Sequence, residues 1–276
     1  MRRFSTSIVG GALGALVIAT PPTPAQADWL GTEFLRGALE GYTSWDGFNA
    51  GAHFGSSSMT ANFGNAASDE VAYILRNTTL ETEIAPSNWT TLGSSTTNSV
   101  LYGGFIGYNW QWNQAVIGLD LGYSRFSSLA TDASDSIERI VTTSDNVSHD
   151  VTITAQSSAK LVDYAALRGR FGYAFSQFLP YAIAGVAVGR FNYANSATVT
   201  DVWTPSGGSA TTFGPITQSD AQDNAFAAGF VLGVGMDVAL TPNLFLRGEW
   251  EYVGFGTIGG IRTDVNVARA GLGVRF

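Results

Sequence analysis

The last nine residues, 268-ARAGLGVRF-276, separate two kinds of side chain with a period of two. One face carries Arg269 and Arg275 with two glycines between them. The other face is apolar and consists of Ala270, Leu272, Val274 and Phe276. A period of two is that of a β-strand, whereas a helix repeats after 3.6 residues. The rest of the chain must then show whether the apolar face meets a protein core or lipid.

Seven further segments alternate in the same way, so that the sequence predicts eight strands. Each is longer than the 5–6 residues or so of a typical globular strand and is long enough for the ~9–11 residues of a tilted membrane strand. The predicted strands are 45–57, 99–113, 115–127, 161–176, 178–193, 224–240, 244–255 and 262–276.

The connections between these strands alternate in length. Long polar segments at 58–98, 128–160 and 194–223 alternate with tight turns near residues 113, 176 and 242. Only the last connection, 256–261, is short where the alternation would give a long one. In an antiparallel meander all long connections then lie at one end, which is typical of outer-membrane barrels. We therefore predict an all-β fold, an eight-stranded antiparallel transmembrane β-barrel with up-and-down topology. The alternating stretch 147–155 predicts a strand that continues beyond the membrane.

The segment 225–240 is apolar enough to suggest a membrane helix instead. Its large residues, however, share one parity from Phe230 to Leu240, and the other parity is mostly glycine and alanine with Asp237. A size alternation of period two suits a strand between lipid and a narrow lumen, and the several glycines disfavour a helix.

The N-terminus resembles an export signal. Arg2 and Arg3 precede a 12-residue apolar run at 8–19, and an Ala-x-Ala site ends at Ala27, so residues 1–27 are predicted to be a signal peptide. Residues 28–44 have apolar side chains spaced three to four apart, which predicts a short amphipathic helix on the periplasmic side. This helix would be a terminal leader, a plug or a docking element.

Composition narrows the class of function. The chain has no cysteine and a formal net charge of −8. The acidic balance and the lack of a basic patch argue against nucleic-acid binding, and no residue cluster predicts a cofactor or metal site.

Parity assigns the charged residues of the strands to the barrel interior. Because an unpaired buried charge is costly, charges of both signs at one depth should pair, which predicts a plugged, hydrogen-bonded lumen. The predicted lumen network is Asp120, Arg168, Arg170, Arg190, Asp237, Arg247, Glu249, Glu251 and Arg269. Aromatic residues assigned to the outer face predict a girdle at the membrane boundaries. The predicted girdle is Tyr108, Trp110, Tyr181, Phe191, Trp250, Tyr252 and Phe276.

Two motifs resemble a known family. The stretches 45-WDGFNAGAHFG-55 and 103-GGFIGYNWQW-112, with the C-terminal Phe276, resemble the small porin-family, OmpA-like barrels of Gram-negative bacteria, which include outer-membrane immunogenic and opacity-type surface proteins. The resemblance implies insertion by the barrel assembly machinery through the strand that ends at Phe276. It also implies contact with outer-membrane lipid and lipopolysaccharide, extracellular loops and periplasmic termini. The long loops are acidic, which would suit an envelope or host-surface partner.

Three functions remain open at this stage. The sequence favours a structural, surface-exposed outer-membrane protein without catalysis. The alternatives are a small-solute, porin-like channel and an envelope lipid-modifying enzyme. His149 beside Asp150 could imitate part of a hydrolase, but neighbouring strand residues point apart and no nucleophile motif is present. His53 is predicted to be a hydrogen-bonded lumen residue.

Overall fold

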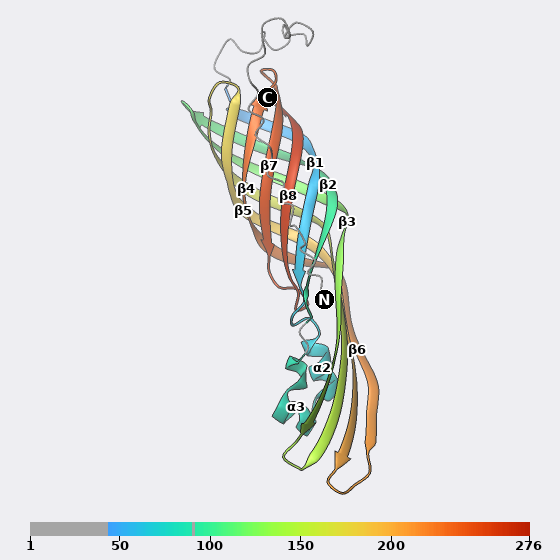
Figure 1. Cartoon of the computed structure of the whole chain (residues 1–276). Helices are drawn as coiled ribbons and strands as arrows, with labels where there is room; N and C mark the ends of the chain where they lie inside the picture. Colours follow the sequence, from blue (N-terminus) through green and yellow to red (C-terminus); the bar gives the residue numbers. More distant parts are fainter. Residues whose placement is uncertain (1–43, 90–91) are drawn as a thin grey trace, which may run out of the picture. The chain divides into compact units, whose positions relative to one another are not determined.

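The computed structural model describes residues 44–89 and 92–276 as a closed eight-stranded barrel (Figure 1). The predicted signal peptide and nearly all of the predicted helical segment 28–44 lie outside the described residues. Every strand pairs antiparallel with its sequence neighbours, and β1 pairs with β8 to close the ring, so the predicted fold is confirmed. The strands are β1 (Gly47–Asn62), β2 (Ser94–Trp112), β3 (Ala115–Thr142), β4 (Val147–Tyr173), β5 (Phe178–Pro205), β6 (Thr211–Ala239), β7 (Leu244–Phe255) and β8 (Arg262–Arg275).

The tight turns lie where the sequence predicts them. β2 and β3 meet across Asn113, and β4 and β5 meet across Ser176, and both residues have a positive φ, of 53° and 52°. Asparagine tolerates this left-handed conformation better than most residues do. We call this end of the barrel the tight-turn end.

The outer face of the barrel is apolar and the inner face is buried. On β6, Leu232 and Val234 are 52% and 57% exposed, whereas Val231 on the same strand is fully buried. This alternation confirms the predicted parity of β6 and gives the barrel a hydrocarbon surface, as a lipid-exposed barrel requires. No helix in residues 44–89 and 92–276 is long and apolar enough to cross a membrane.

Two predicted loops are wrong in conformation. Residues 128–160 and 194–223 are mostly strand, because β3 to β6 run on past the barrel and leave only 143–146 and 206–210 as connections. The continuing parts are 129–142, 147–161, 193–205 and 211–222, which we call the extension. Figure 1 shows the extension as a curved sheet beyond the barrel. The prediction that 147–155 continues a strand is confirmed.

The first long connection folds into helices that cover one face of the extension. It contains α2 (Ser68–Leu75), α3 (Thr79–Ile84) and the 3₁₀ turn η2 (Pro86–Asn88). Thr78 caps α3 by accepting a hydrogen bond from the Glu81 amide at 3.1 Å. The buried cluster beneath the helices contains Val71, Leu75, Leu80, Val151, Ile153 and Val199. The face of β4 and β5 that would continue the lumen is thus buried by protein.

Candidate functional site

Charged side chains fill the middle of the barrel interior. Four arginines and four carboxylates pair there, and their side chains are at most 4% exposed. The structure thus places eight of the nine predicted lumen residues together, the exception being Arg190. The eight are Asp120 of β3, Arg168 and Arg170 of β4, Asp237 of β6, Arg247, Glu249 and Glu251 of β7, and Arg269 of β8. We call this set the ion network.

The ion network is continuous across the barrel. The Arg168 guanidinium donates to Asp120 and, at 2.5 Å, to Glu251. Arg269 donates to the same Glu251 oxygen at 2.7 Å. On the other side of Asp120, Arg247 donates to its second oxygen at 3.0 Å. Each of these carboxylates therefore has two arginine partners, and guanidinium suits such sites because it offers several donors in a fixed plane.

A second part of the ion network surrounds Asp237. Arg247 donates to it through Nε and Nη2 at 2.9 and 2.8 Å, and Arg170 donates at 3.2 Å. Arg170 also donates to the side-chain oxygen of Asn109 at 2.7 Å. Asn109 was missed by the sequence analysis, which considered only charged residues. Its parity on β2, two residues beyond the inward Gly107, would have placed it in the lumen.

Aromatic layers close the ion network from both ends. At the tight-turn end Trp45 packs against Phe245, with ring centroids 6.1 Å apart, and Phe245 contacts Phe105. At the opposite end Phe191 packs against Phe255 at 5.1 Å, and Phe255 contacts Tyr164. Such layers keep water from the charges, which strengthens their mutual attraction.

Two predicted girdle residues lie inside the barrel instead. Tyr181 is 5% exposed, and its hydroxyl donates to Asp237 at 2.9 Å and lies 2.8 Å from Glu249. Phe191 is 1% exposed in the aromatic layer at the end opposite the tight turns. The predicted parity of β5 was therefore wrong. A tyrosine can face such a lumen because its hydroxyl supplies a donor to a carboxylate, and Gly235 opposite leaves room, since a Cβ there would lie 2.6 Å from the Tyr181 ring.

The other girdle residues lie on the outer face. Tyr108, Trp110 and Phe276 are exposed near the tight-turn end, and Tyr252 is half-buried with its hydroxyl on Asp264 at 2.6 Å. Trp250 is also exposed, but it lies between Glu249 and Glu251 at the depth of the ion network. Its place is mid-strand and not at a membrane boundary.

Arg190 is on the outer face of the barrel, so its prediction as a lumen residue is wrong. It follows Val186 and Val188, which are both exposed, at the same parity. There it pairs with Asp163, and its Nε lies 3.1 Å from a carboxylate oxygen. A charge on this face is tolerated because it stands where the apolar belt ends, with the side chain still 30% exposed.

The two histidines lie in different regions. His53 is buried in the lumen, where Nε2 is 2.9 Å from the Ser124 hydroxyl and the ring stacks on Phe105. His149 is in the extension, with Nδ1 2.7 Å from Asp201. Within residues 44–89 and 92–276, no hydroxyl is hydrogen-bonded to His149, and no cluster of metal-ligating residues is present.

A buried acid lies where α2 covers the extension. Glu70 is 5% exposed, and burial, followed by the charges of Asp220 and Asp69, raises the pKa of its carboxyl above 4.5. Its Oε2 has no hydrogen-bond partner among the described residues. Ionised Glu70 therefore opposes the docking of α2.

A closed antiparallel barrel with a hydrocarbon exterior and an ion-paired interior defines an outer-membrane β-barrel protein. Residues 13–276 match the family model described as outer membrane protein beta-barrel domain, and the chain belongs to that family. The predicted family resemblance and the outer-membrane location are thereby confirmed.

Two relatives are similar over about two thirds of the chain. The 25 kDa outer-membrane immunogenic protein of Brucella ovis is 24% identical over 188 residues, which are 67% of this chain and 68% of the relative. The 22 kDa outer membrane protein of Rhizobium leguminosarum bv. viciae is 27% identical over 182 residues, 62% and 64% of the two chains. Among solved structures, Neisserial surface protein A aligns with this chain at 14% identity and a TM-score of 0.36. The alignment covers 83% of this chain and 97% of that protein's chain.

Proposed function

We propose that this protein is a non-conducting outer-membrane barrel that holds the extension and its helices outside the cell. The observation that carries the proposal is the ion network, in which four arginines and four carboxylates share the lumen and balance in charge. The aromatic layers at both ends add two further barriers to solute. An eight-stranded barrel is just wide enough for its side chains to fill it.

The proposed orientation places the tight-turn end in the periplasm and the extension outside. It is supported by the general asymmetry of outer-membrane barrels, in which short turns face the periplasm and long connections face out. In this orientation both chain termini are periplasmic. The acidic extension is then the part available to an envelope or host-surface partner.

Two further partners belong to the proposal. Lipopolysaccharide and other outer-membrane lipids would contact the apolar belt. The assembly machinery would recognise β8 through Phe276, whose side chain is 74% exposed while its amide donates to the Phe48 carbonyl at 2.9 Å. An exposed terminal aromatic fixed by a backbone hydrogen bond is available for recognition.

Absence of catalysis is also proposed. The pair His149 and Asp201 could orient an imidazole as a hydrolase does, but a base needs a nucleophile within hydrogen-bond reach. A surface-display role requires no such group.

Planar-bilayer recording of the purified protein tests the closed lumen. We expect no steady conductance, and a stable open level of the size seen with general porins would overturn the proposal. Protease treatment of intact cells tests the orientation. We expect cleavage of the protein in intact cells within 206–210, the exposed connection between β5 and β6. If this connection is protected in intact cells and is cleaved only after lysis, the proposed orientation is reversed.

A further inference from the structure

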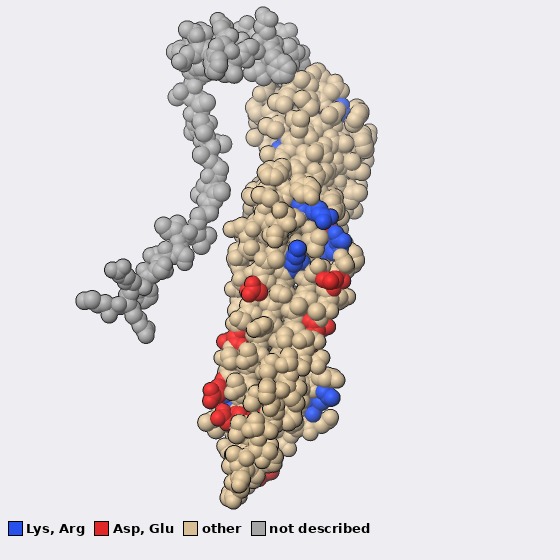
Figure 2. All heavy atoms as spheres, turned by 90° about the vertical axis from the view of Figure 1, so that its right-hand side faces the viewer, with Lys and Arg blue, Asp and Glu red and all other residues tan. Residues whose placement is uncertain are grey.

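Basic side chains gather in one part of the outer surface (Figure 2). They lie where the exposed apolar residues of the barrel end. On β3 the exposed column Leu119, Leu121 and Tyr123 is followed by exposed Arg125. On β5 the exposed residues Val186 and Val188 are followed by Arg190. On β3 and β5, the two strands that flank β4, the exposed apolar residues are therefore followed by a basic residue at the same level.

Strand pairing brings these residues into one row. Arg125 lies opposite Asp163 of β4, and Asp163 lies opposite Arg190 of β5. Arg190 continues the row to β6 through a hydrogen bond of 3.2 Å to Asn224. Lys160 lies one step farther along, at the start of the extension, opposite Asn192. We call Arg125, Lys160 and Arg190 the basic row.

The basic row coincides with three breaks in strand register. The pairing shifts between Arg125 and Leu129 on β3, between Leu161 and Asp163 on β4, and between Phe191 and Tyr193 on β5. Bulges re-aim side chains. Leu161 is fully buried, and uninterrupted alternation would turn Asp163 inward as well, but the bulge places it outside beneath Arg190.

Asp163, the acid between the basic residues, already has hydrogen-bond partners, whereas two of the three basic residues have no ion-pair partner in the described part of the chain. Asp163 accepts from Arg190 with both oxygens and from the Tyr123 hydroxyl at 3.1 Å. Among the described residues, Arg125 and Lys160 form no ion pair. Both are exposed. The basic row thus carries a net positive charge at the edge of the apolar belt, on the side of the extension.

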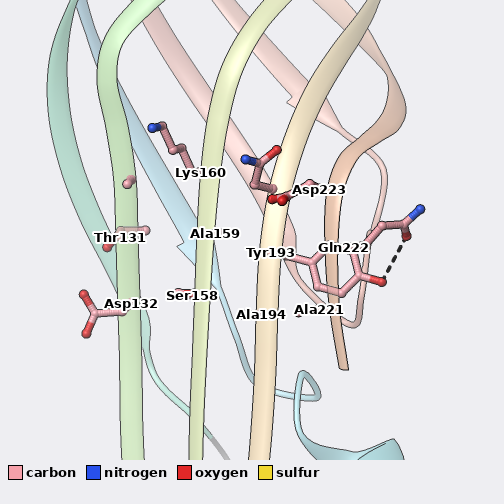
Figure 3. A pocket seen from close by; sticks show the side chains of 12 residues that line it. Thr131, Asp132, Ser158, Ala159, Lys160, Tyr193, Ala194, Ala221, Gln222 and Asp223 are labelled. Atoms are coloured by element: carbon pink, nitrogen blue, oxygen red, sulfur yellow. Dashed lines mark hydrogen bonds between the residues drawn. The ribbon is translucent and has the colours of Figure 1, made fainter. Parts of the chain in front are cut away.

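A groove begins at Lys160 and follows the outer face of the extension, opposite the face that α2 covers (Figure 3). Its volume is about 360 Å³, and its floor is made of small residues. Ser158, Ala194 and Ala221 lie in it, and Asp132 and Asp223 flank it. Carboxylates accept hydrogen bonds from sugar hydroxyls but repel phosphate, so an anionic ligand would keep its phosphate at the basic row and its neutral part in the groove.

We propose that the basic row and this groove bind the phosphorylated sugar headgroup of an outer-leaflet glycolipid. The acyl chains of that lipid lie on the apolar belt, on the tight-turn side of Arg125. Its phosphate contacts Arg125, Lys160 and Arg190, and its sugars enter the groove. A soluble phosphate would not explain why the charges stand at the edge of hydrocarbon. The inference rests on the proposed orientation for the leaflet, but binding in detergent can be measured without it.

The test uses the full mature chain, folded in an uncharged detergent and titrated with purified lipid A, dephosphorylated lipid A and phosphatidylglycerol. We expect lipid A to bind most tightly. The double variant Arg125→Gln/Lys160→Gln keeps the pair of Arg190 with Asp163, and it should lose about 30-fold in affinity, the effect of two basic groups at a lipid surface. Arg76→Gln removes one charge from the residue that follows α2, far from the belt, and should bind as the wild type does.

A second variant separates the sugar from the phosphate. Ser158→Leu fills the groove without changing charge, and it should weaken lipid A but leave phosphatidylglycerol unaffected. Folding of each variant is checked by the gel mobility of unheated against boiled samples. Equal binding of lipid A by wild type and the double variant would overturn the proposal, as would equal binding of dephosphorylated lipid A or of phosphatidylglycerol. The protease experiment above reports on orientation independently.

Discussion

Replacement of Arg168 by methionine tests how far the ion network stabilises the barrel. Arg168 is 1% exposed and is the arginine that joins Asp120 to Glu251. Removing one partner of a buried ion pair costs about 3–5 kcal/mol, because the other charge remains buried. Asp120 keeps Arg247 at 3.0 Å and Glu251 keeps Arg269 at 2.7 Å, so we expect the lower end, about 3 kcal/mol.

The free energy of unfolding can be measured by urea titration of the protein in phosphatidylcholine vesicles, followed by tryptophan fluorescence. Arg262→Met is the matched control, because Arg262 is an exposed arginine at the start of β8, and we expect no change there. The double variant Arg168→Met/Glu251→Gln restores charge balance and should recover about half of the loss, since the two residues are direct partners. A loss for Arg168→Met no larger than that for Arg262→Met would refute the reasoning.

Three further predictions concern other parts of the chain. Tyr181→Phe removes the hydroxyl that serves Asp237 and Glu249, and it should cost about 1–3 kcal/mol in the same urea titration, with an unchanged midpoint as the contrary result. Because the pKa of Glu70 is raised, the docking of α2 is strongest below pH 4.5 and weakens as the pH rises through the higher pKa of the folded state. Glu70→Gln should therefore increase the hydrogen-exchange protection of α2 at pH 7 and remove this pH dependence. Equal protection of α2 in the variant and the wild type would contradict the prediction. Deletion of Phe276 should lower assembly in cells but not folding into vesicles in vitro, whereas equal loss in both would indicate a structural role.

The eight-stranded barrel could be predicted because hydrophobic alternation repeats in every strand. The strand β6 was assigned correctly because its outward residues are large and its inward ones are mostly glycine and alanine. The ion network was largely predictable for a related reason. Only the lumen could accommodate Arg247, Glu249 and Glu251 on one face of β7, with Trp250 and Gly248 on the other.

The errors on β5 have a common physical origin. Around Ile183 the side chains of the two faces differ little in size and polarity, so the assignment depended on treating aromatics as outward and charges as inward. Tyr181 breaks this rule because its hydroxyl serves the ion network, and Arg190 breaks it because it stands at the edge of the belt. Neither contact is visible without the neighbouring strands.

Apart from the stretch 147–155, the extension was missed for a different reason. Its strands expose serine and threonine on one face and bury valine, isoleucine and alanine under α2 on the other. Polar composition alone suggested loops at 128–160 and 194–223. The partner that buries the apolar face comes from residues 63–89 and Leu92, whose packing against β4 and β5 is a long-range feature that local periodicity does not contain.

The most direct measurement is the accessibility of nitroxide labels on both faces of the barrel wall in lipid vesicles. The chain contains no cysteine, so single cysteines at Leu119, Leu121 and Val231 can be labelled without background. Labels at Leu119 and Leu121 should relax strongly with oxygen, which concentrates in hydrocarbon, and weakly with a water-soluble nickel complex. The label at Val231 should be immobile and shielded from both. A label at Leu121 that is shielded from oxygen while the one at Val231 responds to it would contradict the assignment of hydrocarbon to the outside and ions to the inside.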